Sequence, residues 1–511
     1  MQQPKQSKLF AYLSTLICGY ILHLYAFTNI VPNSDGLNRV YDIQNMTVSG
    51  RWFLQYATLP NGYTQMPTFI GLLTLCFLGL SAVLVVDMLE IKSPKIAIMV
   101  GLLTASFPSM GYTFLYLFTA SAYSIGIFLA ILCPWFAKKG GVYRIFGVIS
   151  LSLSMGIYQA YAPLAIALSL ILVLQFSLKK EETPKTILSY GLPYLLVLFG
   201  GAVLYYIILQ LILMVTGQEL LQYLGMSQGY PLSSIPSLIL SSYKQVLIFF
   251  FLPTHDQGTT TVPLALCNLV ALGIGGVSLL LHLKKRKEGW RLPVALLFCA
   301  MIPLAIGFGQ VISPWSAPTP LMQFPYVCVY FLVLALAEPF WEKKPIYSRG
   351  LVALSLLITL SGGWICNLLY TASAQAHRAT ESYATRLYTR IESVPGYHSD
   401  LPIYIIGGFP KELYYSQIES YQIIDHYSAP RDTLLDLNKH VYYYFNHWLN
   451  IPIPEPTEAD LIAMSNSIDF QAMPCYPDDG SIAIIDGVVV AKIDTEYTPK
   501  SDYEIAYENR K

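Results

Sequence analysis

The sequence predicts a polytopic α-helical membrane protein that ends in a soluble α/β domain. Three observations lead to this fold class. Hydrophobic residues make up 54% of the 511 residues and charged residues only 12%, which is far from the balance of a soluble protein. Apolar runs long enough to cross a hydrocarbon core, about 20 residues each, recur up to residue 371. After Tyr370 the composition changes, and residues 372–511 carry ten basic and twenty acidic side chains.

About eleven membrane-spanning segments are expected within residues 1–371. The third and fifth of them are short and interrupted by glycine, so each could fold back together with the segment that follows it. The expected segments are 9–28, 67–90, 96–112, 115–136, 144–157, 160–178, 187–214, 262–283, 292–312, 322–341 and 350–371.

Basic residues predict the orientation of the chain, because cytoplasmic loops retain Lys and Arg. One set of loops holds eighteen Lys and Arg residues, whereas the opposite set holds only Arg39, Arg51 and Lys244. We therefore expect a cytoplasmic N-terminus with an uncleaved first helix. The first outer loop covers about residues 29–66, and the C-terminal domain lies outside.

Residues 372–511 are long enough for a core of their own and read as a small α/β domain. Helices are expected at Thr380–Glu392 and Lys439–Leu449, and strands at Pro402–Gly407 and Tyr421–Asp425. A further pair of strands, 482–485 and 488–492, flanks Asp486-Gly487, a dipeptide that favours the positive φ of a tight hairpin turn.

Several classes of function find no support in the sequence. Seven of the eight cysteines fall in expected spans and only Cys475 lies outside them, so the pattern predicts no disulfide within the outer domain. The formal net charge is zero and the basic loops follow from topology, so nucleic-acid binding is not expected.

The candidate chemistry lies at the outer membrane surface. In the membrane region only four acidic residues are expected outside: Asp35, Asp42, Glu219 and Asp256. Asp35 and Asp42 share one face if their loop is helical, and Arg39 lies between them. Carboxylates and guanidinium groups suit transfer of a sugar from a lipid phosphate, because the acceptor hydroxyl loses a proton while a phosphate leaves.

The chemistry of these side chains predicts a role for each of them in sugar transfer. Asp35 is the candidate base, Arg39 and Arg51 are candidate phosphate ligands, and Asp42 is a second acid for the acceptor or for a divalent metal such as Mg²⁺ or Mn²⁺. An alternative stays open, in which Asp35 caps a turn before Gly36 and Arg51 extends to the membrane interface beside Trp52.

Four stretches resemble the bacterial type II Gtr glucosyltransferase family, a group of multi-spanning GT-C enzymes. They are Asn33-Ser34-Asp35-Gly36-Leu37, Ser49-Gly50-Arg51-Trp52, Ser106-Phe107-Pro108-Ser109 and Met155-Gly156-Ile157-Tyr158-Gln159-Ala160-Tyr161. The resemblance implies a GT-C-like membrane domain in the bacterial cell membrane. It also implies transfer of glucose or a similar hexose from a polyprenyl-phosphate donor to a cell-surface glycan, with the essential acid at Asp35. In one place the chain departs from the family pattern, because Ser121 stands where an acid often precedes the tyrosine.

Other polar groups are weaker candidates. Tyr243–Leu252 is too short to span and reads as a re-entrant or interfacial segment, which would bring Lys244, His255 and Asp256 near the donor phosphate. Tyr158, Gln159 and Tyr161 are candidate sugar contacts at an outer helix end, and Trp315 is a candidate stacking platform. Each of them is also explained by interfacial anchoring or by an incidental polar loop.

Two rival functions remain. A transporter or flippase of lipid-linked sugars would share the many spans, but it places ionisable groups at mid-membrane, and the expected spans carry few of them. A surface-glycan polymerase or ligase would share both the lipid carrier and the side of the membrane.

Overall fold

The computed structural model describes residues 3–31, 36, 47–61, 64–179, 182–220, 232–253, 260–284, 288–312, 319–342, 345–408, 424 and 438–494. By its internal contacts the chain divides into two compact units. Unit 1 comprises residues 1–30 and 42–368, and unit 2 comprises residues 31–41 and 369–511.

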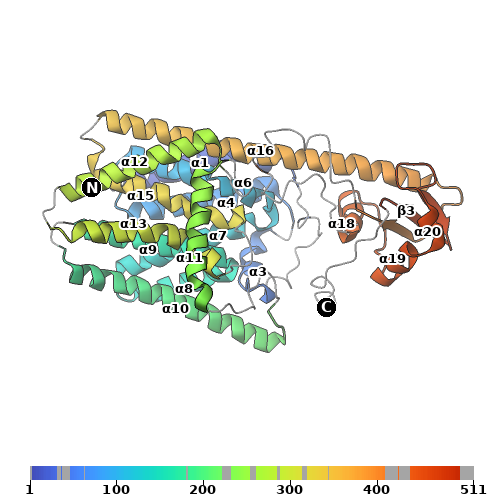
Figure 1. Ribbon diagram of the computed structural model, residues 1–511, viewed down its shortest axis with the longest axis horizontal. Helices are drawn as coiled ribbons and strands as arrows, with labels where there is room; N and C mark the ends of the chain where they lie inside the picture. The colour runs from blue at the N-terminus through green and yellow to red at the C-terminus, as the bar shows by residue number, and fades with distance from the viewer. Residues whose placement is uncertain are drawn as a thin grey trace. The chain divides into compact units, whose positions relative to one another are not determined.

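Unit 1 is built from long apolar helices that run alongside one another (Figure 1). Among the described residues, eight are long and apolar enough to cross a membrane. Six of them are single helices: α1 (Gln3–Thr28), α4 (Pro67–Met88), α7 (Leu117–Lys139), α10 (Pro184–Thr216), α12 (Val262–Lys284) and α16 (Pro345–Glu392). The other two are composite. Gln159–Ser177 consists of η3 (Gln159–Tyr161) and α9 (Ala162–Ser177), and Pro320–Phe340 consists of η6 (Pro320–Val327), α15 (Cys328–Ala337) and η7 (Glu338–Phe340).

A ninth candidate span is bent. Helix α5 (Pro94–Ser106) and helix α6 (Pro108–Leu115) meet at an angle of 43°. The cause is Pro108, because its ring disfavours helical backbone at the preceding residue. Phe107 accordingly has extended dihedrals, φ −61° and ψ 132°.

Three apolar helices are shorter than a full span: α8 (Tyr143–Ile157), α11 (Ile235–Phe251) and α13 (Arg291–Ile306). The prediction of a multi-pass helical protein is confirmed, whereas the count of eleven spans stays a prediction. Helix α11 contains the segment expected to be re-entrant or interfacial, and it runs across the direction of the long helices (Figure 1).

The core of unit 1 lies where α1 packs on α4 and α5, α7 on α4 and α8, α10 on α8, and α13 on α9. Other faces stay apolar although they are exposed. On α10, Phe199 and Val215 are 71% and 81% exposed. Exposed leucine, phenylalanine and valine along a helix of 33 residues are what a hydrocarbon environment favours. Unit 1 is completed by short elements, which are α3 (Leu54–Ala57), η2 (Leu59–Asn61), η5 (Leu232–Ser234) and α14 (Gly309–Ile312).

Unit 2 contains a three-stranded sheet of order β1-β3-β2. Strand β1 (Ile403–Ile406) runs parallel to β3 (Val488–Lys492), and β2 (Ile482–Ile485) runs antiparallel to it. The predicted hairpin is confirmed, because Asp486 and Gly487 have φ values of 49° and 79° at the turn. Of the predicted strand Tyr421–Asp425 only Ile424 lies within the described residues.

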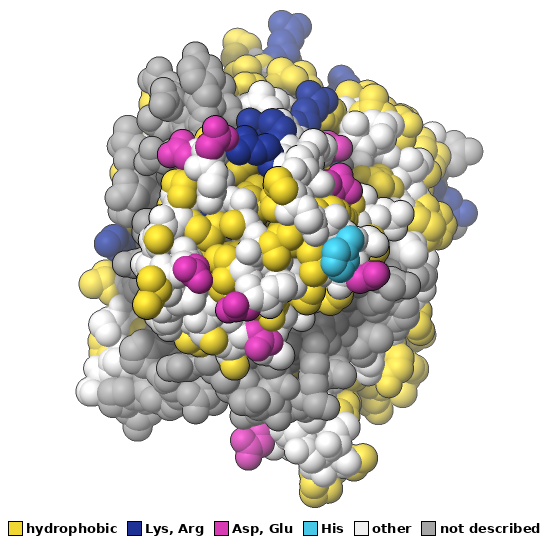
Figure 2. Space-filling model, turned by 90° about the vertical axis from the view of Figure 1, so that its right-hand side faces the viewer, with side chains coloured by type: hydrophobic (Ala, Val, Ile, Leu, Met, Phe, Trp, Pro, Cys, Tyr) yellow, Lys and Arg dark blue, Asp and Glu magenta, His cyan; other side chains and the backbone are white. Residues whose placement is uncertain are grey.

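Side chains alternate across this sheet, so each face buries a separate core. Ile405 and Val489 face the last turns of α16, α18 (Asn438–Tyr443) and the π-helical turn η9 (Tyr444–Trp448). Val490 faces α19 (Glu458–Ser465) and α20 (Ile468–Ala472). In Figure 2, the face of unit 2 that is turned to the viewer shows Asp and Glu side chains scattered among apolar ones.

Candidate functional site at the Gly50 turn and the Tyr158 helix break

The site forms where α8 ends and α9 has not yet begun. Tyr158 takes an extended conformation, with φ −159° and ψ 116°, and this interrupts the helical path before η3. The break leaves the carbonyl of Gly156 available, and the backbone N–H of Phe53 donates to it at 2.8 Å. The segment after the first outer loop is therefore attached to the broken end of α8.

Gly50 makes this attachment possible. Its φ of +79° lies in the left-handed region, which favours glycine. A Cβ atom at this position would lie 2.3 Å from Nε2 of Gln159 and 2.6 Å from the hydroxyl of Tyr205. Glycine is thus required here both by the backbone conformation and by space.

The two side chains that approach Gly50 form a closed hydrogen-bond network with the turn. The Gln159 amide donates to the Ser49 carbonyl at 3.0 Å and to the Tyr205 hydroxyl at 2.9 Å. The Tyr205 hydroxyl donates in turn to the Gly50 carbonyl at 3.0 Å. Tyr205 comes from α10, so the network ties three segments of the chain together.

Next to this network the guanidinium of Arg51 lies over an aromatic cluster. Its Cζ atom is 4.8 Å from the centroid of the Tyr158 ring, a cation–π geometry. Tyr158 stacks on Tyr123 with centroids 5.2 Å apart, and Tyr161 packs edge-on against both rings. Trp52, beside Arg51, is buried against Tyr205 and Leu209 of α10.

A second polar contact joins Asn61, which follows the Gly50 turn in the chain, to Ser121. Ser121, in the first turns of α7, is fully buried and donates to the Asn61 side-chain oxygen at 2.7 Å. The Asn61 amide donates to the Phe118 carbonyl at 2.9 Å. The position expected to hold an acid in related sequences therefore holds a hydroxyl whose partner is a buried amide.

The structure brings together Arg51, Tyr158, Gln159 and Tyr161, four of the predicted site residues. Tyr161 is fully buried behind Tyr158, so it supports the ring that carries Arg51. Lys244 is exposed on α11, which packs mainly on α12, α13 and α14. The other predicted site residues lie outside the described residues, namely Asp35, Arg39, Asp42, His255, Asp256 and Trp315.

Sequence reasoning missed Tyr205 and Asn61. Tyr205 lies beside Tyr206 in a long apolar run, where tyrosines carry no signal of a site. Among the described residues there is no group of three or more His, Cys, Asp or Glu side chains that could hold a metal. Asp42, the acid predicted to hold the acceptor or a divalent metal such as Mg²⁺ or Mn²⁺, is not among those residues.

Fold and site together define a multi-pass helical membrane protein with an arginine and aromatic cluster at one end of its helices. A family model described as glucosyl transferase GtrII matches residues 24–336. The chain belongs to this family, as its sequence motifs predicted. No curated protein and no solved structure gives a match. Membership supports a glycosyltransferase role, in which a sugar passes from a donor to an acceptor.

Proposed function

We propose that this enzyme transfers a hexose, glucose by preference, from a polyprenyl-phosphate donor to a cell-surface glycan at the outer face of the bacterial cell membrane. The observation that carries the proposal is the Arg51 guanidinium held against Tyr158 at the lysine-poor end of unit 1. Family membership supplies the glucosyltransferase role.

Arg51 suits the recognition of a lipid-linked phosphate. A guanidinium grips phosphate through two parallel N–H donors, and an aromatic ring beneath it fixes the plane of the fork. The Gly50 network holds the backbone on one side of Arg51, and buried Trp52 anchors it on the other. The arginine is therefore oriented before the donor arrives, which lowers the entropic cost of binding.

The proposed reaction is a single displacement at the anomeric carbon. The acceptor hydroxyl attacks this carbon and gives its proton to Asp35, and the bond from the anomeric carbon to the phosphate oxygen breaks. Polyprenyl phosphate leaves with the bond electrons, and Arg39 and Arg51 stabilise its charge. Asp42 holds the acceptor or a divalent metal.

The remaining candidates have supporting roles. Lys244 and His255 would add to phosphate binding, and Tyr158, Gln159, Tyr161, Asp256 and Trp315 would contact sugar. Residues 372–511, which we place on the outer side, would shape the path of the acceptor.

The test is the release of polyprenyl phosphate from polyprenyl-phosphate glucose, with host surface glycan as acceptor. Membranes would carry the wild type, Asp35→Asn, Arg51→Lys, or the control Asp478→Asn, which removes an exposed carboxylate of unit 2. We expect Asp35→Asn to lose activity by about 100-fold or more, as for a general base. Arg51→Lys keeps the charge but loses the planar fork, so the donor KM should rise. The control should match the wild type.

Two results would contradict the proposal. Equal activity of wild type and Asp35→Asn would remove Asp35 as the base and point to Asp42. Absence of release by correctly inserted wild type would favour the flippase, to be measured by movement of the lipid-linked sugar between leaflets. The location of buried charge argues against the flippase. A transporter places charges at mid-membrane, whereas among the described residues of unit 1 the one buried Lys or Arg is Arg291, which lies at a helix end.

A further inference from the structure

A pocket of about 250 Å³ lies at the other end of unit 1 from Arg51 and Tyr158. Helix α7 connects the two places, because Tyr123 lies near its start and Lys138 in its last turn. Fifteen residues of helix separate them, about 22 Å at a rise of about 1.5 Å per residue. The polar lining of the pocket consists of Glu90, Lys138, Gln175, Lys179, Tyr190 and His282, and apolar residues of α9 and α15 complete the wall.

The pocket lies at the level where candidate spans end. Helices α4, α7, α9 and α12 end at Met88, Lys139, Ser177 and Lys284, and each contributes a lining residue at or just beyond its end, or within its last turn. Residues at this level of a membrane protein meet the lipid headgroups. Positive-inside counting makes this end the cytoplasmic one.

One rim of the pocket is a helix end with an unusual residue. Beyond α4 the Ile91 N–H donates to the Val86 carbonyl and the Glu90 N–H to the Asp87 carbonyl, the pattern of a Schellman motif. The left-handed position of this motif usually holds glycine, but here it holds Glu90 with φ 58°. Glutamate carries strain in this conformation that glycine would not carry, and its side chain lies at the rim of the pocket.

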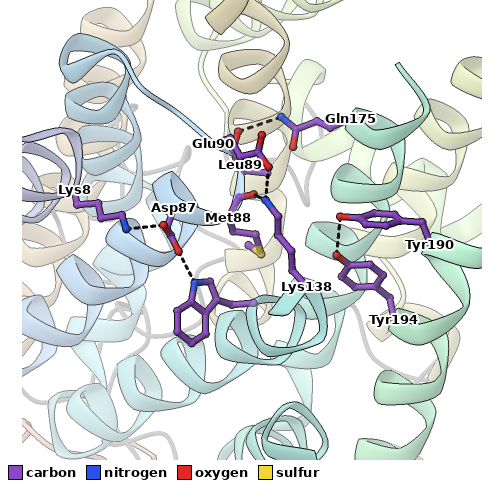
Figure 3. A network of polar contacts seen from close by, with 10 residues as sticks. Lys8, Asp87, Met88, Leu89, Glu90, Lys138, Gln175, Tyr190 and Tyr194 are labelled. Carbon is purple, nitrogen blue, oxygen red and sulfur yellow. Dashed lines mark hydrogen bonds and ion pairs between the residues drawn. The ribbon is translucent and has the colours of Figure 1, made fainter. Parts of the chain in front are cut away.

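That side chain positions Lys138. The Lys138 ammonium lies 2.8 Å from Glu90 Oε1 and donates to the Met88 carbonyl at 2.6 Å, and the Gln175 amide donates to the Leu89 carbonyl (Figure 3). The hydrogen bond from Lys138 holds the pKa of the Glu90 carboxyl below its usual value, so this acid stays ionised at neutral pH. Lys138 is thereby fixed at the pocket.

The other rim is fixed by a buried arginine. Arg291 of α13 donates to the carbonyls of Ser177 at 2.6 Å, Lys179 at 2.7 Å and Glu182 at 3.0 Å. The Arg291 guanidinium therefore holds the backbone carbonyl of Lys179 itself. Among the described residues no carboxylate lies within ion-pair distance of the Lys179 ammonium, which lies 5.6 Å from the Phe176 ring centroid.

The balance of charge and shape determines the kind of ligand. Glu90 offsets Lys138, so Lys179 leaves the pocket with an excess positive charge. Phe176 stacks on Tyr190 with centroids 3.9 Å apart and forms an aromatic wall beside it. Basic pockets between helix ends at the cytoplasmic surface bind the headgroups of anionic lipids, because the phosphate meets the cations while the tails stay in hydrocarbon.

We propose that this pocket binds the phosphate group of a ligand with net negative charge, with Lys179 and Lys138 as its cationic ligands. The ligand is a phospholipid headgroup or a soluble phosphate, and the apolar wall favours the lipid. The proposal is independent of the glycosyl-transfer reaction proposed for the opposite end.

The experiment is native mass spectrometry of the full-length protein in detergent, titrated with dioleoyl phosphatidic acid, dioleoyl phosphatidylcholine or inorganic phosphate. The variants are Lys179→Gln and the control Lys95→Gln, which removes an exposed lysine at the same end of unit 1 outside the pocket. We expect phosphatidic acid to bind more tightly than phosphatidylcholine. The Kd for phosphatidic acid should rise about tenfold in Lys179→Gln, because the variant loses one charged contact to the phosphate. The same Kd should stay unchanged in Lys95→Gln.

The three titrations also identify the source of the phosphate. Binding of phosphatidic acid alone, weakened by Lys179→Gln, upholds the site as a lipid site. Binding of inorganic phosphate that is weakened by the same variant upholds it as a site for the soluble ion. Equal affinity of wild type and Lys179→Gln for phosphatidic acid, or equal affinity for the two lipids, would overturn the proposal. Thermal unfolding of Lys179→Gln confirms that it is folded, and Lys179→Arg should restore binding.

Discussion

At the scale of single residues, Gly50 shows how one small side chain can determine the geometry of a site. Its carbonyl accepts from Tyr205, and its missing Cβ leaves room for Gln159 and Tyr205 to approach. Arg51 follows directly in the chain, so any shift of this turn moves the guanidinium off the Tyr158 ring. Activity should therefore be more sensitive to Gly50 than overall stability is.

We predict that Gly50→Ala lowers glycosyl-transfer activity at least tenfold and destabilises the protein by about 1–3 kcal/mol, from left-handed strain and overpacking. The matched control is Gly141→Ala. Gly141 also has a positive φ, 55°, but a Cβ there meets no atom within 4 Å. The control shares the strain without the collision, so it should keep its activity. Equal activity of the two variants in the polyprenyl phosphate release assay would show that the Gly50 contacts do not matter.

The sequence predicted this site only in part. Ser49-Gly50-Arg51-Trp52 and Tyr158-Gln159-Ala160-Tyr161 were recognisable as motifs, and the structure brings them together. Their meeting depends on contacts over 110 residues of chain, which no local pattern encodes. The partner Tyr205 could not be inferred either, because an apolar helix tolerates a tyrosine for many reasons.

At the scale of elements, hydropathy located the helices but not their irregular ends. The boundary between α8 and α9 was expected near residue 158, because a glycine and polar residues interrupt the apolar run there. The start of α11 at Ile235 was missed, since Ser241, Ser242 and Lys244 hide the helical pattern. Hydropathy also could not predict that side chains far along the chain would cap helix ends. The hydrogen bonds from Arg291 to the end of α9 are the clearest case.

Arg291→Lys should destabilise unit 1 by about 3 kcal/mol or more. Lysine cannot reach three carbonyls at once, and each carbonyl left buried without a donor costs about 1–3 kcal/mol. The control Arg144→Lys changes an exposed arginine and should have little effect. Thermal unfolding in detergent and trypsin cleavage at Lys179 and Lys185 measure the change. An unfolding temperature equal to that of the control would mean that Arg291 does not hold this turn.

At the scale of the whole molecule, the topology predicted from charge can be tested with the native cysteines. Cys475 lies in unit 2, and the other seven cysteines lie in helices of unit 1. We expect an impermeant maleimide to label Cys475 from outside intact cells, where the outer membrane, if present, has been made permeable. Cys475→Ser should abolish that labelling.

A cysteine introduced at Lys95 on the Cys475→Ser background provides the opposite control. It should react only after the plasma membrane is opened, because the lysine-rich end is expected to face the cytoplasm. Labelling of Cys475 only after such opening would reverse the predicted orientation. The catalytic assignment to the outer face would then be wrong as well.

The Arg291 contacts also have a consequence for biosynthesis. The turn that follows α9 receives its hydrogen-bond donors from a residue made 109 positions after Glu182. At about 5–20 residues per second, between about 5 and 20 s pass before the ribosome delivers this arginine. During that interval the end of α9 needs water, lipid headgroups or a membrane insertion factor to satisfy its carbonyls. Nascent chains that stop before residue 291 should therefore be preferred targets of membrane quality-control proteases.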